Sequence, residues 1–344
     1  MVQKLSLLSS QSVALMLLLL VTIISIPGFQ AIPGDLPREC YNRTFADEFN
    51  VFDFFLSYED TQQWLDALAT ENPEKCQLQK LEETYEGRNV SAIVINYNLP
   101  KKIIVIGNLQ AREWVGMSSA VYIIHELILN AGNYPDANKF QWIIVPMPNP
   151  DGYEFSRVHD RKWNKNRSPQ SNSNFGVNLD GNFNNQWNVN GNPSRADPAG
   201  RVYRGPAPFS EPETRALRDL MHNHIDAVLL VDLQGFGQLI LMPWSWTEEP
   251  APNADRTRAI AIAGSAAIFE QTQQFFDVGI ASDYFPFAYG VCHDYCNAIG
   301  VKTCLTLRQT MQEYEISTDQ IILFGQEAFV AIHAMAEKSD LSNI

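Results

Sequence analysis

Cys292, His293 and Cys296 form the group of neighbouring side chains with the plainest chemical potential in this sequence. Thiolate and imidazole are ligands that zinc prefers, and Cys304 follows within a short distance as a candidate fourth ligand. Zinc motifs of this type, however, pair two sets of ligands, and a second set is missing here. In a secreted protein, cysteines at such spacing form disulfides more often than metal sites. We therefore expect a disulfide at this cluster and not a metal.

The chain has five cysteines in all: Cys40, Cys76, Cys292, Cys296 and Cys304. An odd number leaves at least one thiol unpaired or joined to another chain. Because Cys304 lies in an apolar run, it is also a candidate for a buried thiol that packs as a small hydrophobic side chain. The connectivity stays open at this stage.

The amino-terminal residues 1–31 have the layout of a secretory signal peptide. Lys4 precedes an apolar run at residues 13–26, which passes into small residues that end near Ala31. The alternative is a membrane anchor, but the run is short for a bilayer span. We expect cleavage near residues 30–32, secretion, and no membrane attachment afterwards. Three glycan acceptor sequences gain weight from this context, at Asn42, Asn89 and Asn166.

The charge balance bears on the class of partner. With 39 acidic and 25 basic residues, the chain has a formal net charge of −14. Nucleic-acid binding needs a positive surface, so this balance argues against nucleic-acid partners. The composition, with 45% hydrophobic residues, is that of a globular protein with a sizeable core.

Periodicity predicts alternating strands and helices. Short apolar runs predict buried strands at residues 92–95, 103–106, 142–145 and 227–231. Helical patterns occur at residues 61–68, 114–130, 211–222, 256–271 and 320–335. Ser210 is the expected N-cap of the helix in which Pro212 lies just inside the first turn. The segment 164–204 is rich in Asn, Gly and Pro and reads as a long ordered loop, a common place for ligand sites. Together these elements predict a layered α/β domain.

Five segments, spread over roughly residues 54–332, resemble the carboxypeptidase A/B branch of the zinc carboxypeptidases. They read Thr-Tyr-Glu-Gly-Arg at 84–88, Ala-Arg-Glu-Trp at 111–114, Asn-Pro-Asp-Gly at 149–152, Phe-Ser-Glu-Pro-Glu-Thr at 209–214 and Asp-Leu-Gln-Gly-Phe-Gly-Gln at 232–238. The resemblance implies a three-layer α/β/α domain around a mixed, twisted sheet of about eight strands. It places this domain at residues 51–338, after a short segment 32–50 without a folded propeptide and before a tail at 339–344.

The same resemblance implies a catalytic zinc, held by a His-x-x-Glu pair and a later His, with one position open for water. Here the pair reads Gln110-Ala-Arg-Glu113, and the later His is replaced by Gln234. Neutral amide oxygens are poor zinc ligands beside imidazole. Losing only a residue that hydrogen-bonds to a zinc ligand costs about 10–100-fold in zinc affinity. Losing two of the ligands themselves should therefore cost well over about 10⁴-fold. We therefore expect only Glu113 to remain of the ligand set, and no zinc to bind.

The general base of the family, a glutamate, is also replaced. Counting without gaps through residues 294–302 puts its position at Arg308. Matching Leu307-Arg308 to the Leu-Arg that follows the family's glutamate puts it at Thr306 instead. Neither side chain can act as a carboxylate base.

The positions that hold the substrate's terminal carboxylate and carbonyl have changed as well. Asp180 and Gly181 stand where the family has an Asn-Arg pair, so an anion replaces the cationic clamp. Asn164 stands at the arginine that polarises the carbonyl, and Phe285 or Pro286 at the mobile tyrosine. Three further positions are expected in the cleft: Arg112, Phe236 and His293.

A buried carboxylate without its metal needs another partner, because an unpaired buried charge costs several kcal/mol or forces protonation. Arg308 should face Glu113 if both belong to the pocket where base and ligands converge. We expect an Arg308 nitrogen within about 4 Å of a Glu113 oxygen, the usual limit for an ion pair.

These replacements predict a secreted homologue without catalytic activity, which acts as a monomer by binding an unidentified extracellular protein or peptide. The alternative is an active zinc-dependent carboxypeptidase, which would need a metal site that these residues do not supply. A third hypothesis is a different chemistry in the same cleft, carried by Asp180 and Arg308.

Overall fold

A computed structural model describes residues 50–189, 193–309 and 315–341 of the chain. Contacts divide the chain into two units, 1–35 and 36–344, and every described residue belongs to the second. The expected signal peptide, Cys40 and the acceptor Asn42 lie before residue 50 and so outside the described residues. Among the residues that are described, no helix is long and apolar enough to cross a membrane.

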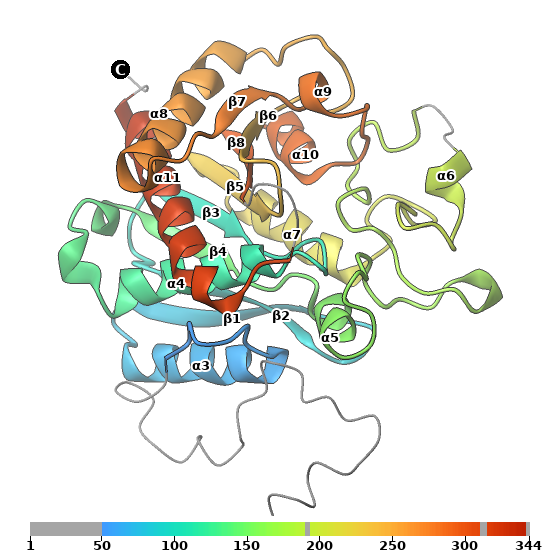
Figure 1. Ribbon diagram of the computed structural model, residues 1–344, viewed down its shortest axis with the longest axis horizontal. Helices are drawn as coiled ribbons and strands as arrows, with labels where there is room; N and C mark the ends of the chain where they lie inside the picture. The colour runs from blue at the N-terminus through green and yellow to red at the C-terminus, as the bar shows by residue number, and fades with distance from the viewer. Residues whose placement is uncertain (1–49, 190–192, 310–314, 342–344) are drawn as a thin grey trace, which may run out of the picture. The chain divides into compact units, whose positions relative to one another are not determined.

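The second unit is built on one sheet of eight strands in the order β1-β2-β4-β3-β5-β8-β6-β7 (Figure 1). Strand β3 pairs in parallel with β4 and β5, and β5 pairs in parallel with β8, while β2 and β6 join this block antiparallel. The strands are β1 Cys76–Glu83, β2 Asn89–Ile95, β3 Lys102–Ile106, β4 Gln141–Val145, β5 Leu229–Gln234, β6 Leu239–Met242, β7 Asp277–Ile280 and β8 Cys304–Arg308. The expected mixed sheet of about eight strands is confirmed.

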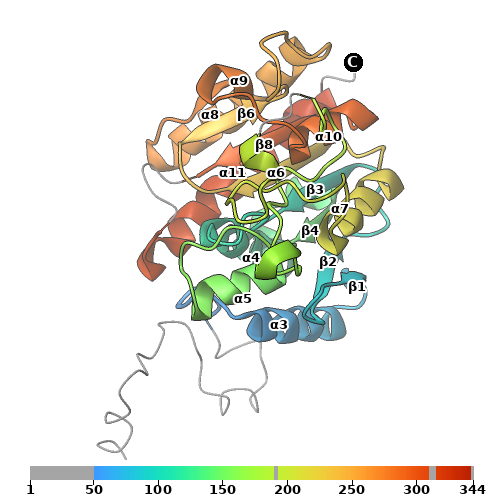
Figure 2. The ribbon, with the colours of Figure 1, turned by 90° about the vertical axis from the view of Figure 1, so that its right-hand side faces the viewer.

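Helices cover both faces of this sheet (Figures 1 and 2). Helices α3, α4, α8 and α11 pack on the face that Ile103 and Val105 of β3 point to, and α7 and α10 pack on the face of Ile104 and Ile106. Successive side chains of a strand point to opposite faces, which is why both sets of β3 residues are buried. The helices are α3 Tyr58–Glu71, α4 Trp114–Ile128, α5 Pro150–Val158, α6 Pro193–Ala196, α7 Pro212–Asn223, α8 Ala254–Thr272, α9 Ala281–Tyr284, α10 Cys292–Ile299 and α11 Ile321–Leu341.

Two boundaries differ from those that the sequence predicts. Glu211, not Ser210, is the N-cap of α7, because the Ser210 hydroxyl is engaged with the Glu211 carboxylate and the Asn182 amide instead of the helix backbone. Helix α11 continues to Leu341, so the tail does not begin at residue 339. Ser339 is fully buried, and its carbonyl accepts a hydrogen bond from Arg256 of α8, which explains the longer helix.

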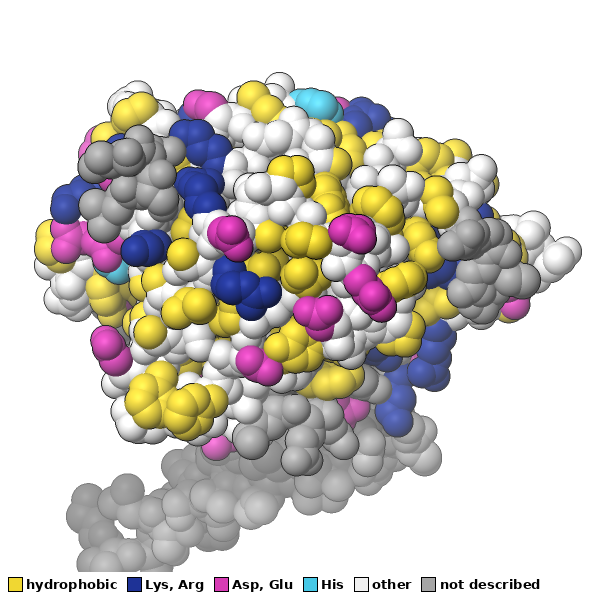
Figure 3. Space-filling model, turned by 90° about the horizontal axis from the view of Figure 1, so that it is seen from above, with side chains coloured by type: hydrophobic (Ala, Val, Ile, Leu, Met, Phe, Trp, Pro, Cys, Tyr) yellow, Lys and Arg dark blue, Asp and Glu magenta, His cyan; other side chains and the backbone are white. Residues whose placement is uncertain are grey.

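The absence of nucleic-acid partners stays a prediction from the charge balance of the sequence. The face that Figure 3 shows carries acidic and basic side chains scattered among apolar ones. No large basic field appears on the described part of that face.

The loop 164–204 is anchored to the start of α7 by a buried amide. Asn166 is fully buried, and its Nδ2 donates to Glu211 Oε2 at 2.8 Å and to Glu213 Oε2 at 3.0 Å. Its Oδ1 accepts from the Val177 backbone at 2.8 Å. A glycan needs an exposed amide nitrogen, so the fold corrects the expectation of a glycan on Asn166. Asn89 lies partly exposed at the start of β2, and glycosylation there stays a prediction.

Glu213 should make the protein less stable as the pH rises. Burial raises the pKa of Glu213 from 4.5 to about 8, and the nearby Glu211 carboxylate adds to this. The folded protein therefore keeps a proton that the unfolded chain loses above pH 4.5, so the free energy of unfolding falls between about pH 4.5 and 8. We expect Glu213→Gln to flatten that fall, as measured by urea unfolding from pH 4.5 to 8.5.

Glu327→Gln is the matched control for this experiment. Burial raises the pKa of Glu327 only to about 6, so its replacement should change the pH dependence below that value and leave the slope from pH 6 to 8 intact. An unchanged slope from pH 6 to 8 in Glu213→Gln would contradict the assignment.

Candidate functional site

The site forms where β3, β5 and β8 end side by side. Gln234 and Arg308, the last residues of β5 and β8, are register partners in the parallel ladder. The chain leaves β3 through a short loop that contains Gln110, and Glu113 is the N-cap of the next helix, α4. Carboxyl ends of parallel strands meet at one edge of a sheet, where α/β proteins place their ligand sites. The structure thus brings together the residues at the expected ligand and base positions.

The amide of Gln234 joins two carboxyl groups. Its Nε2 donates to Asp180 Oδ2 at 2.9 Å and to Asp232 Oδ2 at 2.7 Å. Asp180 is anchored from its other side, because its Oδ1 accepts from the Cys292 backbone N–H at 3.0 Å. Both protons of the Gln234 amide therefore point to carboxylates.

Asp232 is a site residue that the sequence reasoning missed. It is fully buried in β5, and its Oδ1 has no hydrogen-bond partner among the described residues. Burial and the neighbouring Asp180 raise the pKa of Asp232 well above its usual range, and the bond from Gln234 opposes the rise only in part. Burial also raises the pKa of Asp180. The signal available in the sequence was a charged residue inside an apolar strand, which is rare without a function or a partner.

Glu113 is held by backbone and not by a side-chain cation. It is 1% exposed, and its Oε2 accepts from the Gly235 backbone N–H at 2.7 Å. A Cβ on residue 235 would lie 3.0 Å from Glu113 Cδ, so glycine at this position makes the close approach easy. Burial raises the pKa of Glu113, while the positive charge of Arg308 is the largest effect that lowers it.

The expected ion pair between Arg308 and Glu113 does not form within the part of the chain that the structure describes. Arg308 Nε instead donates to the Phe236 carbonyl at 3.0 Å. The guanidinium carbon lies 4.6 Å from the ring centre of Phe285 and 5.4 Å from that of Phe236. The two rings stabilise the Arg308 cation, and the Gly235 backbone N–H already binds the Glu113 carboxylate. The expectation of a direct ion pair between Arg308 and Glu113 is therefore wrong. The electrostatic influence of Arg308 on Glu113 remains.

Below Arg308 lies a small cavity of about 80 Å³. Its polar lining includes Asp180, Gln234, Thr306 and His293. The His293 ring is fixed at both nitrogens, by Thr306 Oγ1 at 2.7 Å and by Ser245 Oγ at 2.9 Å. Thr306 and Arg308 are two residues apart on β8 and line the same cavity, so both candidates for the base position face the cleft. Which of the two occupies that position stays a prediction.

The positions expected for the carboxylate clamp carry neutral and acidic groups. Asn164 is mostly buried and its Nδ2 donates to Asn178 Oδ1 at 3.3 Å, so it is occupied within the loop. Gly181 adds no side chain beside Asp180, and Phe285 presents a ring to Arg308. Arg112 lies partly buried next to Glu113 and slightly lowers the pKa of that carboxyl.

The Cys-His cluster is a disulfide site. Cys296 of α10 is bonded to Cys304 of β8, and Cys76 and Cys292 are buried free thiols. Cys304 is therefore not the free thiol that its apolar surroundings suggested. The bond ties α10 to the sheet, because one of its cysteines lies in the helix and the other in β8. It also uses two of the four candidate metal ligands. The expectation of a disulfide at this cluster is confirmed.

A zinc ion does not fit the three positions where the resemblance implies its ligands. Gln110 and Gln234 supply only amide groups, and the Gln234 amide turns its nitrogen toward two carboxylates. Glu113 uses one oxygen for Gly235. Within the described ranges, no three His, Cys, Asp or Glu side chains are placed so that they could hold a metal ion together.

Comparisons with known proteins agree with the motifs. The family model described as zinc carboxypeptidase matches residues 61–331. A carboxypeptidase B of Helicoverpa zea is 30% identical over 269 residues, which are 74% of this chain and 62% of that protein. An inactive metallocarboxypeptidase of Talaromyces marneffei is 31% identical over 277 residues, 74% of this chain and 44% of that protein. The chain thus spans less than two thirds of the length of these two relatives. The carboxypeptidase A crystal structure from Helicoverpa armigera aligns with a TM-score of 0.77 at 27% identity, over 85% of this chain and 75% of that one.

Proposed function

Since this chain belongs to the zinc carboxypeptidase family, we propose that it is a secreted member without peptidase activity, which acts by binding an extracellular protein or peptide. Secretion is supported by the signal-peptide layout of residues 1–31. The relative from Talaromyces marneffei, whose name calls it inactive, is a precedent for loss of activity on this fold.

The observation that carries the proposal is the hydrogen bonding of Gln234. A third zinc ligand must turn a lone pair toward the metal, but this residue turns both amide protons toward Asp180 and Asp232. These residues thus form a hydrogen-bonded network of their own. The Gln234 amide lies between the carboxyl groups of Asp180 and Asp232, which would repel each other without it. Such a network supports a stable fold and a shaped surface, but it does not prepare a metal site.

The cleft keeps features that suit binding without hydrolysis. The cavity of about 80 Å³ is large enough for a small side chain or group and offers several polar atoms. Phe285 and Arg308 form a rim that can stack on a ligand. Asp180 at the expected clamp position disfavours a free terminal carboxylate, so the ligand is an internal peptide segment or a folded protein.

Metal content tests the loss of the zinc site. After incubation with zinc and dialysis, the purified protein should retain far less than one zinc per chain. The variant Gln110→His with Gln234→His should retain more, because two imidazoles are restored beside Glu113. A stoichiometric, tightly held zinc in the unmodified protein would exclude the proposed function and favour an active carboxypeptidase.

A further inference from the structure

A second pocket, lined by basic and aromatic side chains, lies in the region of the loop 164–204. Its volume is about 440 Å³, which is in the range of sites for small ligands. None of the carboxyl or amide groups around Gln234 lines it. Its walls include the aromatic rings of Phe155, Trp163 and Phe175 and the cations Lys162, Lys165, Arg167 and Arg201.

Arg167 is the central feature of this pocket. Its guanidinium carbon lies 3.7 Å from the ring centre of Phe155, 4.6 Å from that of Phe175 and 4.8 Å from that of Trp163. The side chain is 12% exposed, so the three rings hold the planar group in one place. A guanidinium fixed in this way is ready to make two parallel hydrogen bonds to an anionic ligand.

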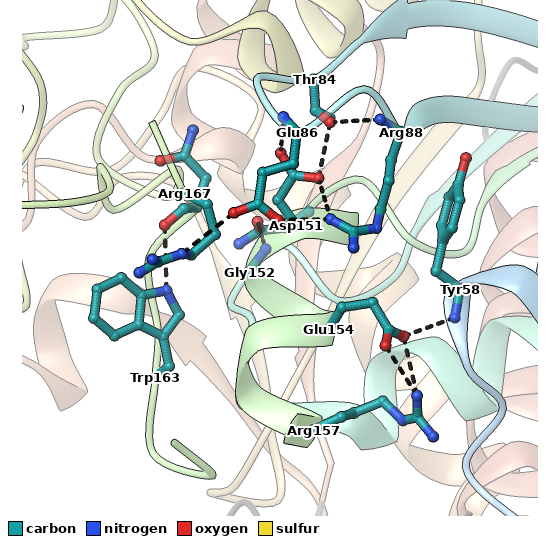
Figure 4. A network of polar contacts seen from close by, with 12 residues as sticks. Tyr58, Thr84, Glu86, Arg88, Asp151, Gly152, Glu154, Arg157, Trp163 and Arg167 are labelled. Atoms are coloured by element: carbon teal, nitrogen blue, oxygen red, sulfur yellow. Dashed lines mark hydrogen bonds and ion pairs between the residues drawn. The ribbon is translucent and has the colours of Figure 1, made fainter. Parts of the chain in front are cut away.

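Arg167 forms one long ion pair, with Glu86, and makes no side-chain hydrogen bond to the described residues (Figure 4). Its Nε lies 3.6 Å from Glu86 Oε1, beyond hydrogen-bond distance, and no other acceptor among the described residues reaches the guanidinium. Glu86 also pairs with Arg88 at 2.7 Å, and Arg88 in turn binds Asp151 (Figure 4). Glu86 is therefore shared between Arg88 and Arg167, and Asp151 is bound by Arg88. With only this long ion pair, the terminal nitrogens of a largely buried cation remain able to bind a further acceptor.

The local charge differs in sign from that of the whole chain. The lining has four cations and a single carboxylate, Asp160, while the chain as a whole has a formal net charge of −14. Lys165 donates to the Pro198 carbonyl at 2.8 Å, and burial lowers its pKa to about 8, which leaves it charged at neutral pH. Lys162 and Arg201 are exposed and so are available to a ligand.

We propose that this pocket binds a ligand that carries a sulfate or phosphate monoester on a ring. The tetrahedral oxyanion accepts from the terminal nitrogens of Arg167 and is neutralised by Lys162 and Arg201. The ring packs on Phe175, whose residue is 41% exposed at the pocket wall. The pocket shares Asn164 with the expected cleft positions, but none of the side chains proposed to contact this ligand belongs to the proposed peptide-binding cleft.

The test measures the equilibrium binding of 4-nitrophenyl sulfate and of 4-nitrophenyl phosphate to the full mature chain. Binding is measured by titration calorimetry at low salt. At least one ester should bind, and the comparison of the two decides between sulfate and phosphate. Arg167→Gln should weaken binding by at least about tenfold, since a charged hydrogen bond is lost. Arg201→Ala and Lys162→Ala should each weaken it by up to about fivefold, as expected of exposed charges.

Two controls decide between this site and general charge attraction. Lys80→Ala removes the same charge from an exposed position on β1 and should leave the affinity unchanged. Neutral 4-nitrophenol should bind much more weakly than the esters. The proposal is overturned if neither ester binds, if 4-nitrophenol binds as well as they do, or if Lys80→Ala weakens binding as much as Arg201→Ala. Should Arg167→Gln fail to fold, the two exposed variants and these controls still decide the matter.

Discussion

The unmodified protein is expected to release no C-terminal residue from blocked dipeptides, whether these end in aliphatic, aromatic, basic or acidic residues. Metal ligands, base and carboxylate clamp act as a unit in this reaction, and groups that act as a unit fail together. We expect Gln110 and Gln234 at the ligand positions, Arg308 or Thr306 at the base position and Asp180 at the clamp. The measurement is release of the C-terminal amino acid over many hours, with zinc supplied and with a chelator as the control.

Restoring the metal ligands alone should not restore turnover. Gln110→His with Gln234→His rebuilds the imidazoles, but Arg308 is the register partner of residue 234 and would place a cation beside the metal. A third change, Arg308→Glu, supplies a carboxylate at that strand end and should be the least that gives detectable hydrolysis. Hydrolysis by the double variant, or chelator-sensitive hydrolysis by the unmodified protein, would show that the inactive interpretation is wrong.

Gln234→Glu should destabilise the fold by about 3–5 kcal/mol at neutral pH, the usual effect of an uncompensated buried charge. The substitution removes both protons that Asp180 and Asp232 accept and puts a third carboxyl group between them. Gln234→Met is the matched control, because it removes the same two hydrogen bonds without adding charge. We expect urea unfolding to rank the variants in the order unmodified, Met, Glu.

The pH dependence identifies the cause of this destabilisation. Burial raises the pKa values of Asp180 and Asp232, so the folded protein retains protons on this group of side chains as the pH rises. The deficit of Gln234→Glu should shrink as the pH falls toward about 4, the ordinary pKa range of carboxyl groups in an unfolded chain, because that chain then also takes up the protons that the folded protein retains. Adding Asp232→Asn should recover part of the stability at pH 7. A Glu variant as stable as the Met variant at pH 7 would mean that the carboxyl groups do not interact as described.

Much of the fold follows from local pattern, and this is where prediction from sequence succeeded. The apolar runs of β3 and β4 and the long apolar stretch of α4 predict buried elements, because burial on both faces leaves a continuous hydrophobic signal. Strands β6 and β7 have only four residues each and were not recognised. Such short strands depend on their neighbours for hydrogen bonds and carry little pattern of their own.

For the site, the sequence by itself determined that the expected zinc-ligand positions 110 and 234 carry amides and not imidazoles. Residue types at Gln110, Gln234 and Arg308 settle what the side chains could donate or accept, and no folding changes an amide into an imidazole. The tertiary structure alone decided how the remaining groups are partnered. It joined Asp232 to Asp180 through Gln234, and it gave Glu113 to the Gly235 backbone instead of Arg308. Partners of this kind come from strand register and from turns distant in sequence, and their choice rests on distances of a few ångströms that residue identity does not encode.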